Sequence, residues 1–199
     1  MNRTLRIAVA DDEADMREYF QTILPTMGHS VTSVARSGKE LVRMCQSNCP
    51  DLIITDIKMP EMDGIEAAKE ICRAKPVPVI LVTAYQEPEL VERAESDHVL
   101  AYLIKPIKQA DLGPAITLAM RRFEQFQTVC KEAADLRQAL EDRKLIERAK
   151  GVVMKRASVD EPEAFRRLNR LARNKNWKLA EIAHRILGAE EIFQELDRT

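Results

Sequence analysis

The chain has 199 residues and a formal net charge of −1; 45 % of the residues are hydrophobic, 32 % charged and 5 % aromatic, with only 6 glycines. This composition excludes a disordered or fibrous protein and favours helices over an all-β sandwich. No apolar run approaches the roughly 18 residues of a membrane span, and residues 1–6 lead into a short apolar stretch unlike a secretory signal. We expect a soluble cytoplasmic protein of one or two domains that does not bind membranes.

The cysteines and histidines follow no disulfide or metal-binding pattern. Four cysteines are too few and too scattered for a disulfide scaffold, and the three histidines lie too far apart in sequence for a zinc site. We expect reduced thiols without a metal.

Charge is distributed unevenly along the chain. Residues 1–120 carry 13 Lys and Arg against 18 Asp and Glu, whereas residues 121–199 carry 18 against 14. The excess is concentrated in residues 143–185, with 13 basic against 5 acidic side chains. An acidic half joined to a basic half indicates two functions, the basic one compatible with nucleic acid, although solvated basic helices give the same pattern.

Residues 1–120 alternate β-branched apolar runs with amphipathic segments. The runs predict strands at 5–10, 30–35, 52–55, 77–83 and 99–104. The segments between and after them predict helices at 14–24, 39–45, 65–73, 88–94 and 111–120. Five successive βα units predict an α/β domain with a doubly wound, five-stranded parallel sheet.

The region after residue 120 contains a short coiled-coil pattern. Its apolar residues are spaced by 3, 4, 3 and 4, namely Phe126, Val129, Ala133, Leu136 and Leu140. The pattern predicts either pairing of two chains, parallel or antiparallel, or an amphipathic helix packed on its own domain.

Beyond residue 143 the pattern predicts a small all-α bundle of three helices. The first continues the coil as far as residue 156. Asp160 and Glu163 have the spacing of a helix N-terminus, and Asn176 can end that second helix. The third begins at Leu179 and is expected to stop at Gly188.

Polar residues follow four of the predicted strands. Asp11 and Asp12 follow the first strand and Asp56 the third, while Thr83 and Lys105 end the fourth and fifth. The carboxyl ends of parallel strands share one edge, so these groups should converge there. Clustered carboxylates suit Mg²⁺, and an aspartate can accept a phosphoryl group. Helix capping or solvent contact is the alternative, and five positions on one edge argue against it.

Residues 5–120 resemble the receiver domain of two-component response regulators, which has the flavodoxin-like fold. The matching motifs are Val9-Ala10-Asp11-Asp12-Glu13, Ile54-Thr55-Asp56-Ile57-Lys58-Met59-Pro60 with Asp63-Gly64, Val82-Thr83-Ala84, and Tyr102-Leu103-Ile104-Lys105-Pro106.

The receiver resemblance implies that a sensor histidine kinase phosphorylates Asp56. It also implies that Asp11, Asp12, Asp56 and the backbone carbonyl of Lys58 hold Mg²⁺. Thr83 and Lys105 would bind the phosphoryl oxygens, and Tyr102 would be the aromatic switch residue. Lys58 and Tyr85 occupy the positions where family members tune the lifetime of the phosphoryl group.

Residues 145–187 resemble the ANTAR domain, a three-helix RNA-binding module, through the sequence Glu147-Arg148-Ala149-Lys150-Gly151-Val152-Val153-Met154 and later alanines. The small or adaptable residues of the motif are interpreted as helix-packing positions: Ala149, Met154, Ala164, Ala172 and Ala183. The candidate RNA contacts are basic: Lys150, Arg156, Arg166, Arg170, Arg173, Lys175 and Lys178. Trp177 either stacks on a loop base or fills a helix junction.

The leading interpretation is a phosphorylation-controlled response regulator that binds RNA hairpins in nascent transcripts to control transcription antitermination, and is not an enzyme. The alternatives are a DNA-binding response regulator, a dimerisation module without nucleic acid, and a metal-dependent phosphatase. The phosphatase is disfavoured because no second carboxylate stands two positions after Asp56. The expected domains are a receiver at 1–122, a coiled-coil linker at 123–143 and an ANTAR-like domain at 144–199. We expect a homodimer after phosphorylation.

Overall fold

The computed structural model describes residues 4–84 and 99–196. The chain divides into two compact units, Met1–Thr128 and Val129–Thr199, and the predicted domain boundaries at 122 and 143 remain predictions. The helix expected at 88–94 and the position of Tyr85 lie outside the described residues. No described helix has the length and apolar character needed to cross a membrane.

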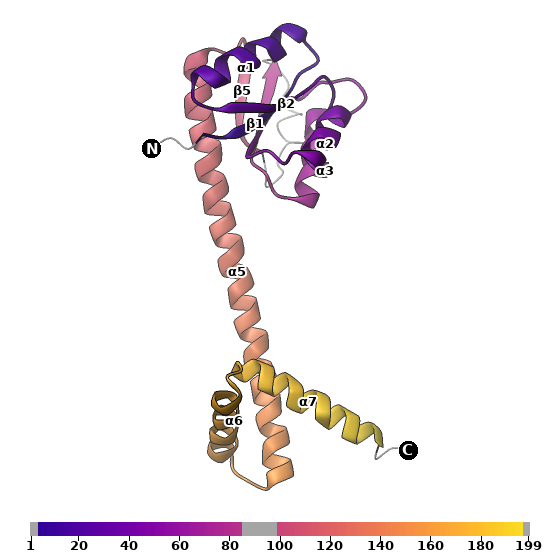
Figure 1. Ribbon diagram of the computed structural model, residues 1–199, viewed down its shortest axis with the longest axis vertical. Coiled ribbons are helices and arrows are strands. Elements are labelled where there is room, and N and C mark those ends of the chain that lie inside the picture. The colour runs from indigo at the N-terminus through magenta and orange to yellow at the C-terminus, as the bar shows by residue number, and fades with distance from the viewer. Residues whose placement is uncertain (1–3, 85–98, 197–199) are drawn as a thin grey trace. The chain divides into compact units, whose positions relative to one another are not determined.

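The N-terminal unit contains the predicted five-stranded parallel sheet (Figure 1). Its strands are β1 (Arg6–Ala10), β2 (Ser30–Ala35), β3 (Leu52–Asp56), β4 (Val79–Ala84) and β5 (Val99–Lys105), in the order β2-β1-β3-β4-β5. Every residue of β3 is buried, as expected for a central strand covered on both faces. The strand prediction is confirmed, with ends shifted by no more than two residues.

Helices cover both faces of this sheet. They are α1 (Ala14–Thr26), α2 (Gly38–Ser47), α3 (Gly64–Ala74) and the start of α5 (Gln109–Ala157). Alternate strand residues point to opposite faces, so Ala8 and Ile53 pack with α2 and α3, whereas Ile7 and Ile54 pack with α1 and α5. The doubly wound fold is confirmed, and it places the carboxyl ends of all five strands at one edge.

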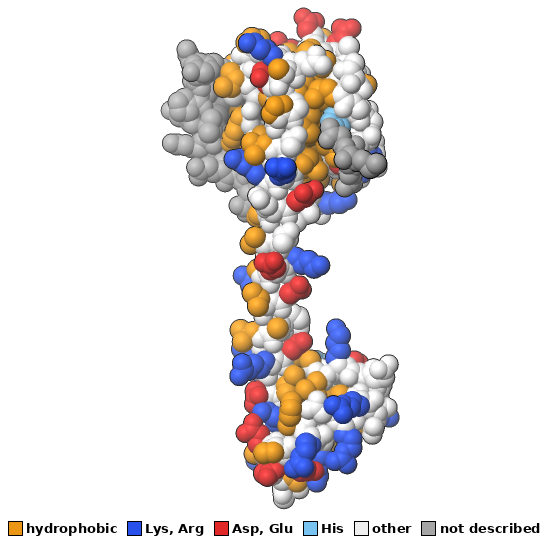
Figure 2. All heavy atoms as spheres, turned by 90° about the vertical axis from the view of Figure 1, so that its left-hand side faces the viewer, with side chains coloured by type: hydrophobic (Ala, Val, Ile, Leu, Met, Phe, Trp, Pro, Cys, Tyr) orange, Lys and Arg blue, Asp and Glu red, His pale blue; other side chains and the backbone are white. Residues whose placement is uncertain are grey.

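Helix α5 is a single helix of 49 residues. It joins the helix predicted at 111–120, the coiled-coil pattern and the first helix of the tail. Several apolar residues of the coiled-coil pattern are exposed, with Val129 at 63 %, Leu136 at 72 % and Leu140 at 54 %. Figure 2 shows hydrophobic side chains on the surface of this helix. The structure holds one chain, so pairing through these residues remains a prediction.

The C-terminal unit is the predicted three-helix bundle, formed by the end of α5, α6 (Glu161–Lys175) and α7 (Leu179–Leu196). Asp160 caps α6 by accepting a hydrogen bond from the Glu163 N–H at 2.9 Å, and Asn176 ends it in the left-handed conformation. The packing interpretation is confirmed for the four alanines, because Ala149, Ala164, Ala172 and Ala183 are buried, whereas Met154 is half-buried.

The predicted end of the third helix at Gly188 is wrong. Helix α7 continues to Leu196, and Gly188 is not among the described residues with positive φ. A glycine inside a helix costs only about 1 kcal/mol relative to alanine, and the residues after it, Ala189, Glu190 and Glu191, are compatible with a helix. The extension leaves Ile192, Phe193 and Leu196 largely exposed.

Candidate functional site

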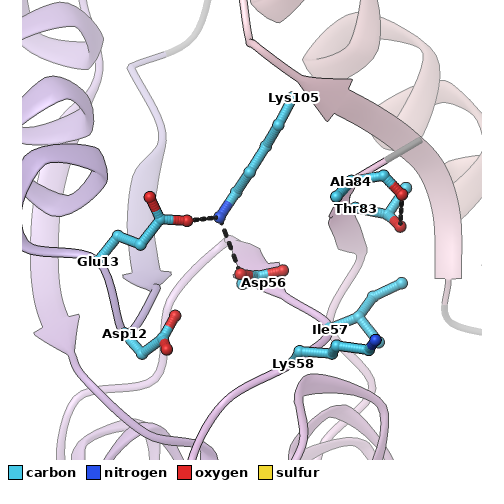
Figure 3. A pocket seen from close by; sticks show the side chains of 8 residues that line it. All are labelled: Asp12, Glu13, Asp56, Ile57, Lys58, Thr83, Ala84 and Lys105. Carbon is cyan, nitrogen blue, oxygen red and sulfur yellow. Dashed lines mark hydrogen bonds and ion pairs between the residues drawn. The ribbon is translucent and has the colours of Figure 1, made fainter. Parts of the chain in front are cut away.

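The predicted polar residues meet in a cleft at the carboxyl edge of the sheet. The cleft has a volume of about 260 Å³. It is lined by Asp12, Glu13, Asp56, Ile57, Lys58, Thr83, Ala84 and Lys105 (Figure 3). Asp11 lies at the same edge, completely buried beside Asp56 and Lys105.

Four carboxylates form one cluster at this edge. Asp11, Asp12, Glu13 and Asp56 each offer an oxygen within 4.8 Å of the others. Burial raises the pKa of Asp11, and this outweighs the hydrogen bond that Asp11 accepts from the Glu13 N–H and the nearby Lys105 ammonium. Crowded carboxylates of which one is buried repel one another unless a cation compensates them.

The donor set of this cluster fits Mg²⁺. Asp11 Oδ2 is buried and makes no hydrogen bond within the described residues, although it lies 3.1 Å from Lys105 Nζ as an ion pair. Such an oxygen can accept a coordinated cation directly or through water. Carboxylate oxygens with room for water are what Mg²⁺ requires. The cluster is therefore consistent with a metal site.

Lys105 is one of two lysines that line the cleft, and its ammonium lies among the carboxylates. Its Nζ lies 2.9 Å from Asp56 Oδ2 and 2.7 Å from Glu13 Oε1 (Figure 3). Burial lowers the pKa of Lys105, but the surrounding carboxylates outweigh burial and hold the pKa above its ordinary value. Lys105 therefore stays charged at neutral pH, within reach of any group attached to Asp56.

Thr83 comes from β4, the strand beside Asp56, and Tyr102 comes from β5, one strand further along the sheet. The Thr83 hydroxyl lines the cleft but donates a hydrogen bond to the backbone carbonyl of Ala84 at 3.1 Å (Figure 3). Tyr102 is 37 % exposed. To contact a phosphoryl group, Thr83 has to exchange this hydrogen bond for one to the new oxygens.

The backbone around Asp56 is fixed by close packing with the start of α3. The Gly64 N–H donates to the Ile57 carbonyl at 2.9 Å, and a Cβ built on Gly64 would overlap the carbonyl oxygen of Asp56. The Thr55 hydroxyl also donates to that oxygen, at 3.0 Å. Glycine at position 64 therefore permits the close approach that sets the end of β3.

Sequence reasoning did not assign two residues of the site. Glu13 pairs with Lys105, and Arg17 Nη1 donates hydrogen bonds to the carbonyls of Asp11 and Asp12, each at 2.8 Å. The position of Glu13 directly after two aspartates was a usable signal. The sequence contains no such signal for Arg17, because its contact with the carbonyls of Asp11 and Asp12 depends on the direction of the first turn of α1.

The candidate RNA contacts of the C-terminal unit fall into two groups. The first group is paired with carboxylates. Lys150 is buried, and its Nζ lies 2.7 Å from Glu147 and 2.6 Å from Glu161. Arg156 pairs with Glu190, and Arg166 pairs with Glu163.

The other group is exposed and makes no ion pair within the described residues: Arg170, Arg173, Lys175 and Lys178. Figure 2 shows basic side chains gathered on this unit. The unpaired group offers the more available charge.

Comparison with known families agrees with both halves of this description. Residues 7–117 match the response regulator receiver domain, and residues 134–187 match the ANTAR domain. The fold and site thus define a two-component response regulator. The chain belongs to the family of response regulators that join a receiver domain to an ANTAR RNA-binding antitermination domain, and it is a regulatory protein rather than an enzyme.

Similar proteins share these parts. The transcriptional regulatory protein PdtaR of Mycobacterium tuberculosis is 38 % identical over 182 residues, covering 92 % of this chain and 89 % of its own. A receiver domain protein from Clostridium thermocellum has a TM-score of 0.55 at 32 % identity, covering 60 % of this chain and 97 % of its own. The response regulator domain of Thermotoga maritima CheB has a TM-score of 0.55 at 30 % identity, with 60 % and 98 % covered.

These family memberships imply partners of two kinds. A receiver domain implies a kinase, and an ANTAR domain implies RNA. Residues 134–187 match the ANTAR domain rather than a DNA-binding one, which argues against the DNA-binding alternative.

Proposed function

We propose that a sensor histidine kinase phosphorylates Asp56, and that the phosphorylated protein binds RNA hairpins in nascent transcripts to control transcription antitermination. The observation that carries the first half is the convergence of Asp56, Lys105 and the acidic cluster in one cleft. A nucleophile, a fixed cation and a set of metal ligands are the groups that phosphoryl transfer to an aspartate requires.

In the proposed reaction a carboxylate oxygen of Asp56 attacks phosphorus, and the bond from phosphorus to the donor breaks as the donor leaves with its electron pair. Lys105 is already 2.9 Å from Asp56 Oδ2, so a short movement brings its ammonium to the phosphoryl oxygens. Thr83 is released from the Ala84 carbonyl and donates to another of these oxygens. Mg²⁺, held by Asp11, Asp12, Asp56 and the carbonyl of Lys58, would neutralise charge on the phosphoryl group.

Phosphorylation is tested with acetyl phosphate and mass spectrometry of the intact protein. We expect uptake of one phosphoryl group with Mg²⁺ present, none with excess chelator, and none in Asp56→Asn. Glu18→Gln, which removes an exposed carboxylate of α1, is the matched control and should behave as the parent. Undiminished uptake in Asp56→Asn would contradict the assignment.

RNA binding is assigned to the unpaired basic group of the C-terminal unit. Cations without protein partners can neutralise phosphates without first breaking an ion pair. The change Arg173→Gln, Lys175→Gln and Lys178→Gln should weaken hairpin binding and reduce its dependence on salt. Arg166→Gln with Arg167→Gln is the control, because Glu163 already pairs with both of those side chains.

This measurement uses fluorescence anisotropy of a labelled two-hairpin RNA at several salt concentrations, with duplex DNA of the same stem sequence as competitor. Equal losses in the triple variant and the control would place the RNA surface elsewhere. Displacement of RNA by duplex DNA at equal concentration would favour the DNA-binding alternative.

We also propose that phosphorylation favours a homodimer through the coiled-coil pattern of α5. In its heptad, Glu132 occupies a g position and Arg137 an e position. A parallel pair places Glu132 beside Arg137 of the partner subunit, whereas an antiparallel pair brings the e positions, which include Arg137 and Lys144, together. The charges therefore favour the parallel arrangement.

A further inference from the structure

The C-terminal unit contains three exposed aromatic rings, and a cation lies over each. The distances from cation to ring centre are 5.8 Å for Lys150 and Phe165, 5.1 Å for Arg156 and Phe193, and 4.0 Å for Arg185 and Trp177. Each cation is also paired with a glutamate: Lys150 with Glu161, Arg156 with Glu190, and Arg185 with Glu181. The three rings are thus held in similar ways.

Their electrostatic surroundings differ. Phe165 lies between Glu163 and Arg166, so charges of both signs surround it, whereas Phe193 lies among Glu190, Glu191 and Glu195. Trp177 instead lies between Lys175 and Lys178, both exposed and without an ion pair in the described residues. A polyanion is repelled from the acidic surroundings of Phe193, is not favoured by the mixed charges around Phe165, and is attracted to the basic surroundings of Trp177.

The position of Trp177 is fixed before any ligand binds. Asn176 adopts the left-handed conformation, with φ 54° and ψ 41°, and the Trp177 N–H donates to the Ala172 carbonyl at 3.0 Å. Arg185 holds the ring from α7 at 4.0 Å, yet the side chain remains 37 % exposed. A preordered ring loses little conformational entropy when a planar group stacks on it.

We propose that Trp177 stacks on one unpaired base of an RNA hairpin loop while Lys175 and Lys178 bind the neighbouring phosphates. This inference rests on the proposed RNA-binding function and adds to it a residue that recognises the loop rather than the stem. Splayed loop bases are recognised by aromatic rings, whereas bases paired in a stem cannot stack in this way. The Arg185 guanidinium against the indole positions the ring, so Trp177 is assigned the contact and Arg185 a supporting role.

Trp177 is the single tryptophan of the chain, so the intrinsic tryptophan fluorescence of the full-length protein reports on this side chain directly. A two-hairpin RNA is titrated into the unaltered protein, and binding is followed in parallel by the anisotropy of a label on the RNA stem. We expect the fluorescence of Trp177 to be quenched with the same midpoint as the anisotropy change. The same RNA with abasic loop positions should bind roughly tenfold more weakly and leave the fluorescence unchanged.

The matched variants are Trp177→Ala, Trp177→Phe and Phe193→Ala. Trp177→Ala should bind the RNA roughly tenfold more weakly, Trp177→Phe should retain part of the affinity, and Phe193→Ala should bind as the parent. Circular dichroism establishes that each variant is folded. The fluorescence titration uses the unaltered chain, so its result does not depend on the folding of any variant.

The outcomes separate this inference from the function on which it rests. Saturated RNA binding with unchanged Trp177 fluorescence, or full affinity in a folded Trp177→Ala, would overturn the stacking role and leave RNA binding standing. Failure of the unaltered phosphorylated protein to bind any hairpin in the anisotropy measurement would overturn both.

Discussion

Lys105 Nζ lies 2.9 Å from Asp56 Oδ2, so the cation that ends β5 is already paired with the carboxylate that ends β3. The same ammonium lies 2.7 Å from Glu13 Oε1 and 3.1 Å from Asp11 Oδ2. One lysine thus compensates three carboxylates that would otherwise repel one another. The proposed phosphorylation of Asp56 would therefore redistribute contacts that Lys105 already makes, rather than recruit a distant cation.

Lys105→Met should destabilise the receiver domain, because the carboxylates lose their compensating charge. We expect a loss of about 2 kcal/mol in the free energy of unfolding, less than for a fully buried pair because the cleft opens to solvent. Added Mg²⁺ should stabilise this variant more than the parent, since the cation replaces the missing charge. Urea unfolding with and without Mg²⁺ measures both effects.

Lys108→Met, at an exposed position of the same segment, is the control for loss of a lysine as such and should unfold as the parent does. An equal Mg²⁺ effect in Lys105→Met and the parent would show that the cation does not bind among these carboxylates.

Gly64→Ala should disturb the end of β3. The added Cβ would overlap the Asp56 carbonyl oxygen, so the strand end or α3 has to shift, at a cost of about 2 kcal/mol. Phosphorylation by acetyl phosphate should slow as well, because Asp56 moves with its backbone. Gly151→Ala is the matched control: its Cβ meets no atom within 4 Å, and removing a glycine from a helix should stabilise by about 0.5 to 1 kcal/mol. A parent-like Gly64→Ala would refute the close-packing argument.

Much of this site follows from the sequence because topology determines it. Once five βα units predict a parallel sheet, Asp11, Asp56 and Lys105 must lie at one edge, wherever the individual side chains point. The sequence does not predict which carboxylate or carbonyl each cation contacts. That Lys105 pairs with Glu13, and that Arg17 holds the β1–α1 loop, depends on loop directions that periodicity does not encode.

The C-terminal unit shows the same limit. The basic residues are visible in the sequence, but their availability is not, because Glu147 and Glu161 neutralise Lys150 from different helices. The end of α7 was misplaced for a related reason. A glycine that ends a helix commonly adopts the left-handed conformation, and Gly188 does not adopt it.

Lys150→Met should weaken the attachment of α6 to α5. The Lys150 ammonium joins Glu147 on α5 to Glu161 at the start of α6 and lies over the Phe165 ring, and the two carboxylates raise its pKa. We expect a lower melting temperature for the C-terminal unit, in thermal unfolding followed by circular dichroism, and a salt dependence of RNA binding equal to that of the parent. A parent-like melting temperature with a reduced salt dependence would instead show that Lys150 binds phosphate.

Cys45 should make the receiver domain less stable in alkali. Burial raises the pKa of the Cys45 thiol to about 12, with the nearby thiols of Cys49 and Cys72 adding to it. A pKa that is higher in the folded than in the unfolded state gives stability that is complete below pH 9.0, the ordinary pKa, and is lost as pH rises toward 12. The loss should reach at most about 1.4 kcal/mol per pH unit.

Urea unfolding at pH 8 and pH 10.5 measures this alkaline loss in the parent and in Cys45→Ala. The variant should be less stable at pH 8 because it lacks the buried sulfur, but should lose less stability between the two pH values. Cys130→Ala, which removes an exposed thiol of α5, is the control. An identical alkaline loss in Cys45→Ala and the parent would contradict the assignment.

The polar substitutions Leu136→Gln and Leu140→Gln should separate phosphorylation from its effect on RNA binding. These side chains are 72 % and 54 % exposed in the single chain, so the changes should leave each unit folded and Asp56 phosphorylatable. On the proposed mechanism, a phosphoryl group on Asp56 would draw Lys105 and Thr83 toward it, which would make room for Tyr102 to turn inward and would repack β5 against the start of α5. Because α5 is one continuous helix, this repacking can favour pairing along its exposed apolar residues.

Pairing would bring two ANTAR domains to one two-hairpin RNA, and two linked contacts bind at least tenfold more tightly than one, by a rough estimate from effective concentration. The parent should therefore gain both dimer fraction, measured by light scattering after gel filtration, and RNA affinity on phosphorylation. The double variant should gain neither and keep the weak binding of a monomer.

Glu132→Lys alone should reduce the dimer fraction, and Glu132→Lys with Arg137→Glu should restore it, because a parallel pair needs opposite charges at these two positions. If the variant with Leu136→Gln and Leu140→Gln still gained RNA affinity on phosphorylation while remaining monomeric, the signal would pass from receiver to ANTAR domain within one chain.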